Sequence, residues 1–339
     1  MSMSISPNSL RDTGAAASRR WRDLALLGLL FVLVVVGLGG LAAATGWEET
    51  KAALGRVTPA EIGILLLLSL VNYLGRGLRW HIFARRLGLN TRLVQSIRHF
   101  LGGFAMSVTP GRVGELVRMR WIRRETGWSF DRTAPLVLVD RAADLSAMAL
   151  LLAIALALSA TGVAGGVPVA VLAMLAAFAA TRSALLKTAG DLAHRMTGRR
   201  LPRLFARVRR AARSLSAFTD PGALAVATLL GAVGWFAEGY AFHLLLIWMG
   251  AEVELWIAVA IFVFATLAGG LTGAPGGLGG AEAAMVALLK LQGVPLEIAV
   301  PATLIIRVTT LWFAILIGII VFPFAERQSK KALHDLEGN

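Results

Sequence analysis

The chain has 339 residues, of which 57% are hydrophobic and 16% charged, and its formal net charge is +14. This composition excludes an ordinary soluble globular domain, and the absence of cysteine excludes disulfides and thiolate metal sites. The positive charge does not indicate nucleic acid, because the Lys and Arg residues gather in short segments between apolar runs, as in cytoplasmic loops next to anionic lipid. We therefore predict an all-α polytopic membrane protein without a nucleic-acid partner.

Apolar runs of about 20 residues, which suffice to cross the hydrocarbon core, recur along the chain. The first, Leu24–Ala44, follows the basic arm 1–23. Because it is longer than the apolar part of a signal peptide, we favour a retained anchor over a cleaved signal. The later runs lie at about 59–83, 134–159, 163–182, 222–249 and 298–324, with two interrupted segments at 94–122 and 254–292. Together they predict one membrane domain over residues 24–325, a tail at 326–339 and no attached soluble domain.

The orientation follows from the distribution of Lys and Arg, which favours the cytoplasmic side. Bases are concentrated in the N-terminal arm, in the segment after the second run, in the loop 183–220 and in the tail. The loop 46–58 has a balanced charge, and the segment 250–254 carries acids and no base. We therefore expect both termini and the basic loop 183–220 to be cytoplasmic.

The two interrupted segments read GGFAMSVTPGRVGELVRMRW (102–121) and GGLTGAPGGLGGAEAAMVAL (269–288). Each is apolar enough for a membrane, yet each carries a Pro-Gly break followed by an acid. Both ends of the first segment are basic, whereas the ends of the second lie near the acids of 250–254 and near Gln292. Each segment is therefore expected to enter the membrane and return on the same side, as a re-entrant helical hairpin, and the two would enter from opposite faces.

The order span, hairpin, span occurs twice, over about 59–160 and about 221–324. An arginine recurs on the span after each hairpin: Arg141 follows Pro110 by 31 residues, and Arg307 follows Pro275 by 32. These features predict two inverted-topology repeats, an arrangement from which transporters build a substrate site near the membrane centre. Because broken helices at membrane depth must be covered by protein or water, a central cavity is expected.

Ionisable side chains inside the membrane are the candidate substrate-binding residues, since each costs roughly 2.5–3.5 kcal/mol at the bilayer centre. Arginine holds phosphate in a bidentate fork, and the helix N-termini after the breaks favour an anion. If these groups share a cavity, an acid and a base from opposite halves should pair. The candidates are Arg112, Glu115, Asp140, Arg141, Glu238, Glu282 and Arg307, and the hairpin breaks are Pro110, Gly111, Gly114, Pro275, Gly276 and Gly279.

Simpler interpretations stay open for several of these residues. Arg112 could reach the cytoplasmic interface with its long side chain, and Asp140 with Arg141 could form a purely structural ion pair. The glycines could serve only close helix packing. The motif PGGLGG lacks the Lys-Ser/Thr of a nucleotide-binding loop, and no metal-ligand spacing or nucleophile–base cluster occurs, so we expect no cofactor, no metal and no enzymatic activity.

Several motifs together resemble one family. NYLGRGLRW, VTPGRVGELVRM, VDRAADL and APGGLGGAEAAMVALL followed by IIRVTTLWF are similar to the lysylphosphatidylglycerol synthase transmembrane-region family, also called flippase-like domain proteins. The resemblance covers about residues 20–325. It implies a membrane domain like that of the bacterial multiple peptide resistance factor, which moves aminoacylated phosphatidylglycerol between leaflets. No aminoacyl-transferase domain follows the last span here, so synthesis of the lipid is not expected.

The sequence thus predicts a multi-pass lipid flippase of a bacterial-type inner membrane, with an anionic or aminoacylated phospholipid as its partner. Two alternatives remain: a carrier of polyprenyl-phosphate sugars or of a small anion, and a scaffold without transport activity. The scaffold would hold a lipid or glycosyl-transfer enzyme at the membrane, with the basic loop as docking surface. A homo-oligomer is also open.

Overall fold

The computed structural model describes residues 55–107, 113–159, 163, 165–181, 221–272 and 274–337, with isolated positions 48, 52 and 188. These residues form helices and turns and contain no strand. The predicted first run, Leu24–Ala44, and nearly all of the basic loop 183–220 lie outside the described residues. The same holds for Pro110, Gly111 and Arg112.

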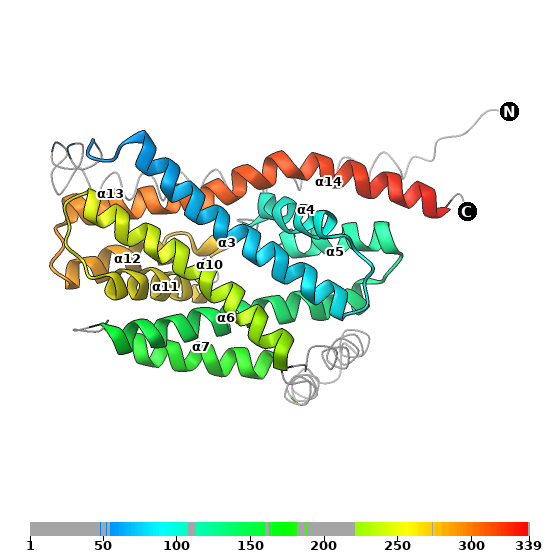
Figure 1. Ribbon diagram of the computed structural model, residues 1–339, viewed down its shortest axis with the longest axis horizontal. Coiled ribbons are helices and arrows are strands. Elements are labelled where there is room, and N and C mark those ends of the chain that lie inside the picture. Colours follow the sequence, from blue (N-terminus) through cyan, green and yellow to red (C-terminus); the bar gives the residue numbers. More distant parts are fainter. Residues whose placement is uncertain are drawn as a thin grey trace, which may run out of the picture.

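The first half of the described chain contains five α-helices and the second half contains the rest (Figure 1). In the first half they are α3 (Pro59–Arg86), α4 (Leu93–Gly103), α5 (Val113–Thr126), α6 (Phe130–Leu158) and α7 (Gly166–Thr181), with a 3-10 turn, η1 (Phe104–Met106), after α4. In the second half they are α10 (Pro221–Trp248), α11 (Leu255–Leu271), α12 (Gly280–Leu291), α13 (Leu296–Arg307) and α14 (Phe313–Glu337), with a 3-10 turn, η3 (Pro275–Gly277), before α12 and a π-helical segment, η4 (Val308–Trp312), after α13.

Four helical segments within the described residues are long and apolar enough to cross a membrane. They are Pro59–Arg86, Phe130–Leu158, Gly222–Trp248 and Leu296–Asp335, the last combining α13, η4 and α14. Helix α3 shows why such a segment begins and ends where it does. Thr58 and Glu61 form a reciprocal capping box at its start, and Arg85 and Arg86 lie in its last turn, where the helix dipole favours cations. The prediction of an all-α protein with several membrane spans is confirmed.

The second interrupted segment is a helix, a glycine-rich break and a second helix. Gly276, Gly277 and Gly279 have φ angles of 65°, 69° and 81°, a region that residues with a Cβ seldom enter. A Cβ on Gly269 would lie 2.7 Å from that of Ala281, so α11 and α12 approach each other closely. The glycines therefore provide both the break and the close helix packing.

The first interrupted segment has the same close approach. A Cβ on Gly114, in α5, would lie 2.5 Å from the carbonyl oxygen of Gly103, at the end of α4. At the other end of this pair, Glu125 accepts hydrogen bonds from Gln95 and Arg98. Burial raises the pKa of Glu125, but the contact with His99 and these partners outweigh it, so the pKa is lowered and the carboxylate stays ionised. Helices α4 and α5 are thus joined at both ends.

The two halves pack against each other throughout their length. Helix α3 lies along α10, α11 packs on α6, and α14 packs on α4, η1 and α5. The last contact is tight, because a Cβ on Gly318 of α14 would lie 2.2 Å from the backbone nitrogen of Ala105. In Figure 1, α4 and α5 lie toward one end of the elongated molecule and α11 and α12 toward the other.

Candidate functional site

A cavity of about 630 Å³ lies between the two halves. Its wall combines apolar side chains with a set of charged ones, and both helix–break–helix segments contribute to it. The charged residues that line it are Arg76, Glu115, Arg118, Arg141, Asp144, Glu238 and Arg307. Backbone of the second break, at Gly276 and Gly277, also faces the cavity. A cavity with charged residues in its wall is therefore present between the halves, where the sequence predicted a central cavity.

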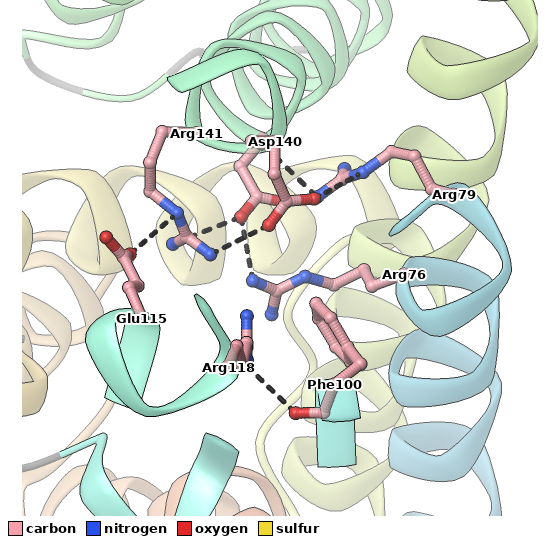
Figure 2. A network of polar contacts seen from close by, with 8 residues as sticks. Arg76, Arg79, Phe100, Glu115, Arg118, Asp140 and Arg141 are labelled. Atoms are coloured by element: carbon pink, nitrogen blue, oxygen red, sulfur yellow. Dashed lines mark hydrogen bonds and ion pairs between the residues drawn. The ribbon is translucent and has the colours of Figure 1, made fainter. Parts of the chain in front are cut away.

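Helix α3 is held to α6 by a fully buried arginine, Arg79, which has no exposed surface. Its Nη2 lies 2.6 Å from Oδ1 of Asp140 and 2.7 Å from Oδ1 of Asp144, and its Nε donates to Asp140 at 3.0 Å. Figure 2 shows Arg79 reaching across from α3 to Asp140 on α6. Because both carboxylates are buried, the contact with Arg79 offsets the high cost of placing them in an apolar interior.

Two further arginines complete this network. Arg76, one helical turn before Arg79, donates from Nη2 to Asp144 at 2.7 Å. Arg141 lies within 3.1–3.3 Å of oxygens of Asp140, Asp144 and Glu115. Through Glu115, Arg141 connects the α6 span to the start of α5 (Figure 2). Asp140 is almost completely buried and does not line the cavity, whereas Arg141 does.

The second half repeats this link between hairpin and span with one acid and one base. Arg307, at the end of α13, donates from Nε to Glu282 at 2.6 Å and from Nη2 to the carbonyl oxygen of Gly276 at 2.9 Å. One guanidinium thus holds both the first turn of α12 and the glycine break. The π-helical segment η4 begins directly after Arg307, and the hydroxyl of Tyr73 on α3 donates to the carbonyl oxygen of Thr310 within it.

Ion pairs at the predicted positions form within each half. Glu115 meets Arg141, and Glu282 meets Arg307. The expectation that an acid and a base from opposite halves would pair is therefore wrong for these four residues. The reason is that each acid lies on the helix directly before the next span, α5 before α6 and α12 before α13, so it meets the arginine of that span.

The other predicted site residues fall into three groups. Glu238 lines the cavity and is almost fully buried, and no Lys or Arg among the described residues pairs with it. Gly114 and Gly276 lie at the cavity wall, while Gly279 caps α12 with its positive φ. Pro275 begins the η3 turn.

Sequence reasoning missed four charged residues of the site. The predicted substrate-binding residues do not include Arg76, Arg79 or Arg118, nor Asp144, which stands in the motif VDRAADL. The spacing could have indicated three of them: Arg76 and Arg79 are three residues apart and Asp140 and Asp144 four, so each pair shares one helix face. For Arg118 no such pattern exists, because it stands among other arginines.

Comparison with known proteins settles the family. A model of the lysylphosphatidylglycerol synthase TM region matches residues 25–318. The chain belongs to this family. Over 333 aligned residues it is 23% identical to a UPF0104 membrane protein of Methanothermobacter thermautotrophicus. The alignment covers 91% of this chain and 98% of that protein. A second match to a UPF0104 membrane protein of that organism is 32% identical over 108 residues, covering 32% of this chain and 31% of the relative.

The buried Arg79 contact gives a stability prediction for this family member. Arg79→Met keeps the length of the side chain but leaves Asp140 and Asp144 with less compensation, and breaking a buried pair in this way costs about 3–5 kcal/mol. We expect a clear fall in the unfolding temperature of the purified protein in detergent. The double variant Arg79→Met, Asp140→Asn should recover part of the loss, because one uncompensated charge is removed. An unchanged unfolding temperature in Arg79→Met would contradict a structural role for this contact.

Proposed function

We propose that this protein is a lipid translocase, which moves a phosphate-bearing headgroup through the central cavity while the acyl chains stay in the lipid. The observation that carries the proposal is the cavity itself, a charged space between two halves whose outer surfaces are apolar. Large hydrophobic side chains such as Leu67, Leu175 and Leu229 are exposed, while Arg76, Arg307 and Glu238 face inward. Ionisable residues inside a membrane domain commonly mark a substrate pathway.

Matching features in the two halves support an inverted-repeat architecture. The Glu–Arg contact of each half joins the same kinds of element, a hairpin helix and the following span, and the sequence separations are 26 residues for Glu115–Arg141 and 25 for Glu282–Arg307. Each hairpin also packs against the last span of the other half. We infer that repeats of about 59–160 and 221–324 face the membrane in opposite senses, each with a re-entrant hairpin, and that such a pair could alternate its access.

The substrate is proposed from the family and from the charges of the cavity. The family is that of the lysylphosphatidylglycerol synthase TM region. This favours an anionic or aminoacylated phospholipid as the substrate. The placement in a bacterial-type inner membrane, with the arm 1–23, the loop 183–220 and the tail 326–339 in the cytoplasm, belongs to the same proposal. A polyprenyl-phosphate sugar offers the same phosphate chemistry, so a transport assay has to compare the two lipids.

The inverted topology predicts which positions share a membrane face. The chain has no native cysteine, so single cysteines can be introduced without background. We expect Asn90→Cys and Ser129→Cys to react with a membrane-impermeant thiol reagent from the cytoplasmic side. Glu252→Cys and Gln292→Cys should react only from the other side. Labelling of Glu252→Cys and Gln292→Cys from opposite faces would show that 254–292 crosses the membrane once, and the hairpin proposal would fail.

The translocase proposal predicts loss of lipid transfer when the Arg307 contacts are removed. Arg307→Ala leaves the buried carboxylate of Glu282 uncompensated and releases the Gly276 carbonyl, so we expect transfer to fall by about tenfold or more. Arg307→Lys should recover only part of the rate, because an ammonium lacks the bidentate fork. The measurement is leaflet-resolved transfer of fluorescent phosphatidylglycerol and of a polyprenyl phosphate in proteoliposomes.

Two further variants make this test decisive. Arg327 is an exposed arginine on α14. The variant Arg327→Ala is therefore the matched control and should transfer lipid at the wild-type rate. The double variant Arg307→Ala, Glu282→Gln removes the uncompensated charge, so it should fold better than Arg307→Ala and still fail to transfer lipid. Wild-type rates in Arg307→Ala and in the double variant would contradict the central-site proposal and favour the scaffold alternative.

A further inference from the structure

Arg118 occupies an unusual position in the cavity wall. It lies on α5, is 4% exposed and lines the cavity. Its Nη2 donates to the carbonyl oxygen of Phe100 at 2.9 Å, and its guanidinium lies 4.2 Å from the centre of the Phe100 ring. The rings of Trp80 and Phe104 lie at 5.4 and 5.7 Å. The guanidinium is therefore held by aromatic rings and one carbonyl oxygen, and it forms part of the cavity wall.

Arg118 differs from the other arginines of the cavity in its charge partners. Arg76, Arg141 and Arg307 each have a carboxylate oxygen within 3.3 Å. Among the described residues no carboxylate lies within 4 Å of Arg118, and its buried Nε has no hydrogen-bond partner. A buried cation of this kind is costly unless an anion joins it. Arg118 thus brings to the cavity wall a positive charge that no described carboxylate contacts directly.

A second guanidinium adds to the positive charge at the same place. Arg76 lies over the Phe100 ring at 5.5 Å, so Arg76 and Arg118 share one aromatic ring. Arg76 uses Nη2 for Asp144, while its buried Nε has no hydrogen-bond partner. Figure 2 shows both side chains extending toward the same region beside Phe100. Two like charges beside one ring favour the binding of an anion near them.

We propose that Arg118, together with Arg76, is the phosphate-binding subsite of the cavity. This inference rests on the proposed translocase function and specifies where its substrate is held. A planar guanidinium presents paired N–H donors that match the oxygens of a phosphate. The aromatic faces stabilise the cation when the anion leaves, so binding can be reversible, as a translocase requires. Gly103 makes room for this geometry, because a Cβ there would lie 2.1 Å from Nε of Arg118.

The test measures binding by the full-length protein in detergent, without any transport step. Titration calorimetry compares short-chain phosphatidylglycerol with short-chain diacylglycerol, which lacks the phosphate. The wild type should bind the phospholipid about tenfold more tightly or better, as expected for charge-assisted hydrogen bonds. Arg118→Gln should abolish this preference, and Arg118→Lys should keep part of it. Arg123→Gln is the matched control: it removes the same charge from an exposed position on the same helix and should bind like the wild type.

A soluble headgroup and an unfolding measurement complete the experiment. Competition by glycerol 3-phosphate would show that the phosphate is recognised without acyl chains. A failure of glycerol 3-phosphate to compete would show that the site binds only the intact lipid. Without ligand, Arg118→Gln should unfold at the wild-type temperature or above, because it removes a buried charge that no described carboxylate contacts directly. A lower unfolding temperature with an intact preference for phosphatidylglycerol would instead show a structural residue and overturn the proposal. Selective binding through Arg118 without lipid transfer by the wild type would refute the translocase proposal and leave this subsite in place.

Discussion

The cost of placing charge inside an apolar membrane domain governs the rest of this structure. Each arginine or carboxylate within the spans must find a partner or water, because hydrocarbon offers neither. Arg79 illustrates the constraint, since it is fully buried between Asp140 and Asp144 and thereby fixes α3 on α6. The same requirement joins α5 to α6 and α12 to α13 by an ion pair, so charge compensation, and not apolar contact alone, fixes how these helices pack.

The glycine breaks and the π-helical segment follow from this constraint as local solutions. The break at 275–279 places the carbonyl of Gly276 toward Arg307, which requires backbone angles that glycine adopts readily. Immediately after Arg307 the helix changes to π geometry, a feature often found at functional sites. The hydroxyl of Tyr73, from the other half, contacts a carbonyl of this segment. The region around Arg307 is therefore where hairpin, span and the opposite half meet.

The sequence allowed much of this arrangement to be predicted, and its limits have physical causes. Hydrophobic length identified the four long segments at about 59–83, 134–159, 222–249 and 298–324. The acids after the Pro-Gly breaks and the arginines of the following spans led to the residues Glu115, Arg141, Glu282 and Arg307. The partners of these residues could not be predicted, because charge alone does not distinguish the following span from the opposite half. Arg118 was not predicted, because one arginine in a run of arginines does not stand out from a basic cytoplasmic end. Only the approach of α4 to α5 at Gly103 and Gly114 turns this one side chain into the cavity.

We propose that a phosphate-bearing headgroup occupies the cavity between the halves. Electron cryo-microscopy of the protein in nanodiscs rich in phosphatidylglycerol tests this proposal most directly. We expect density for the headgroup phosphate beside Arg118 and Arg76, with the acyl chains passing out toward the surrounding lipid. A cavity without headgroup density, in a map that shows ordered phosphatidylglycerol only on the outer apolar surface, would contradict it.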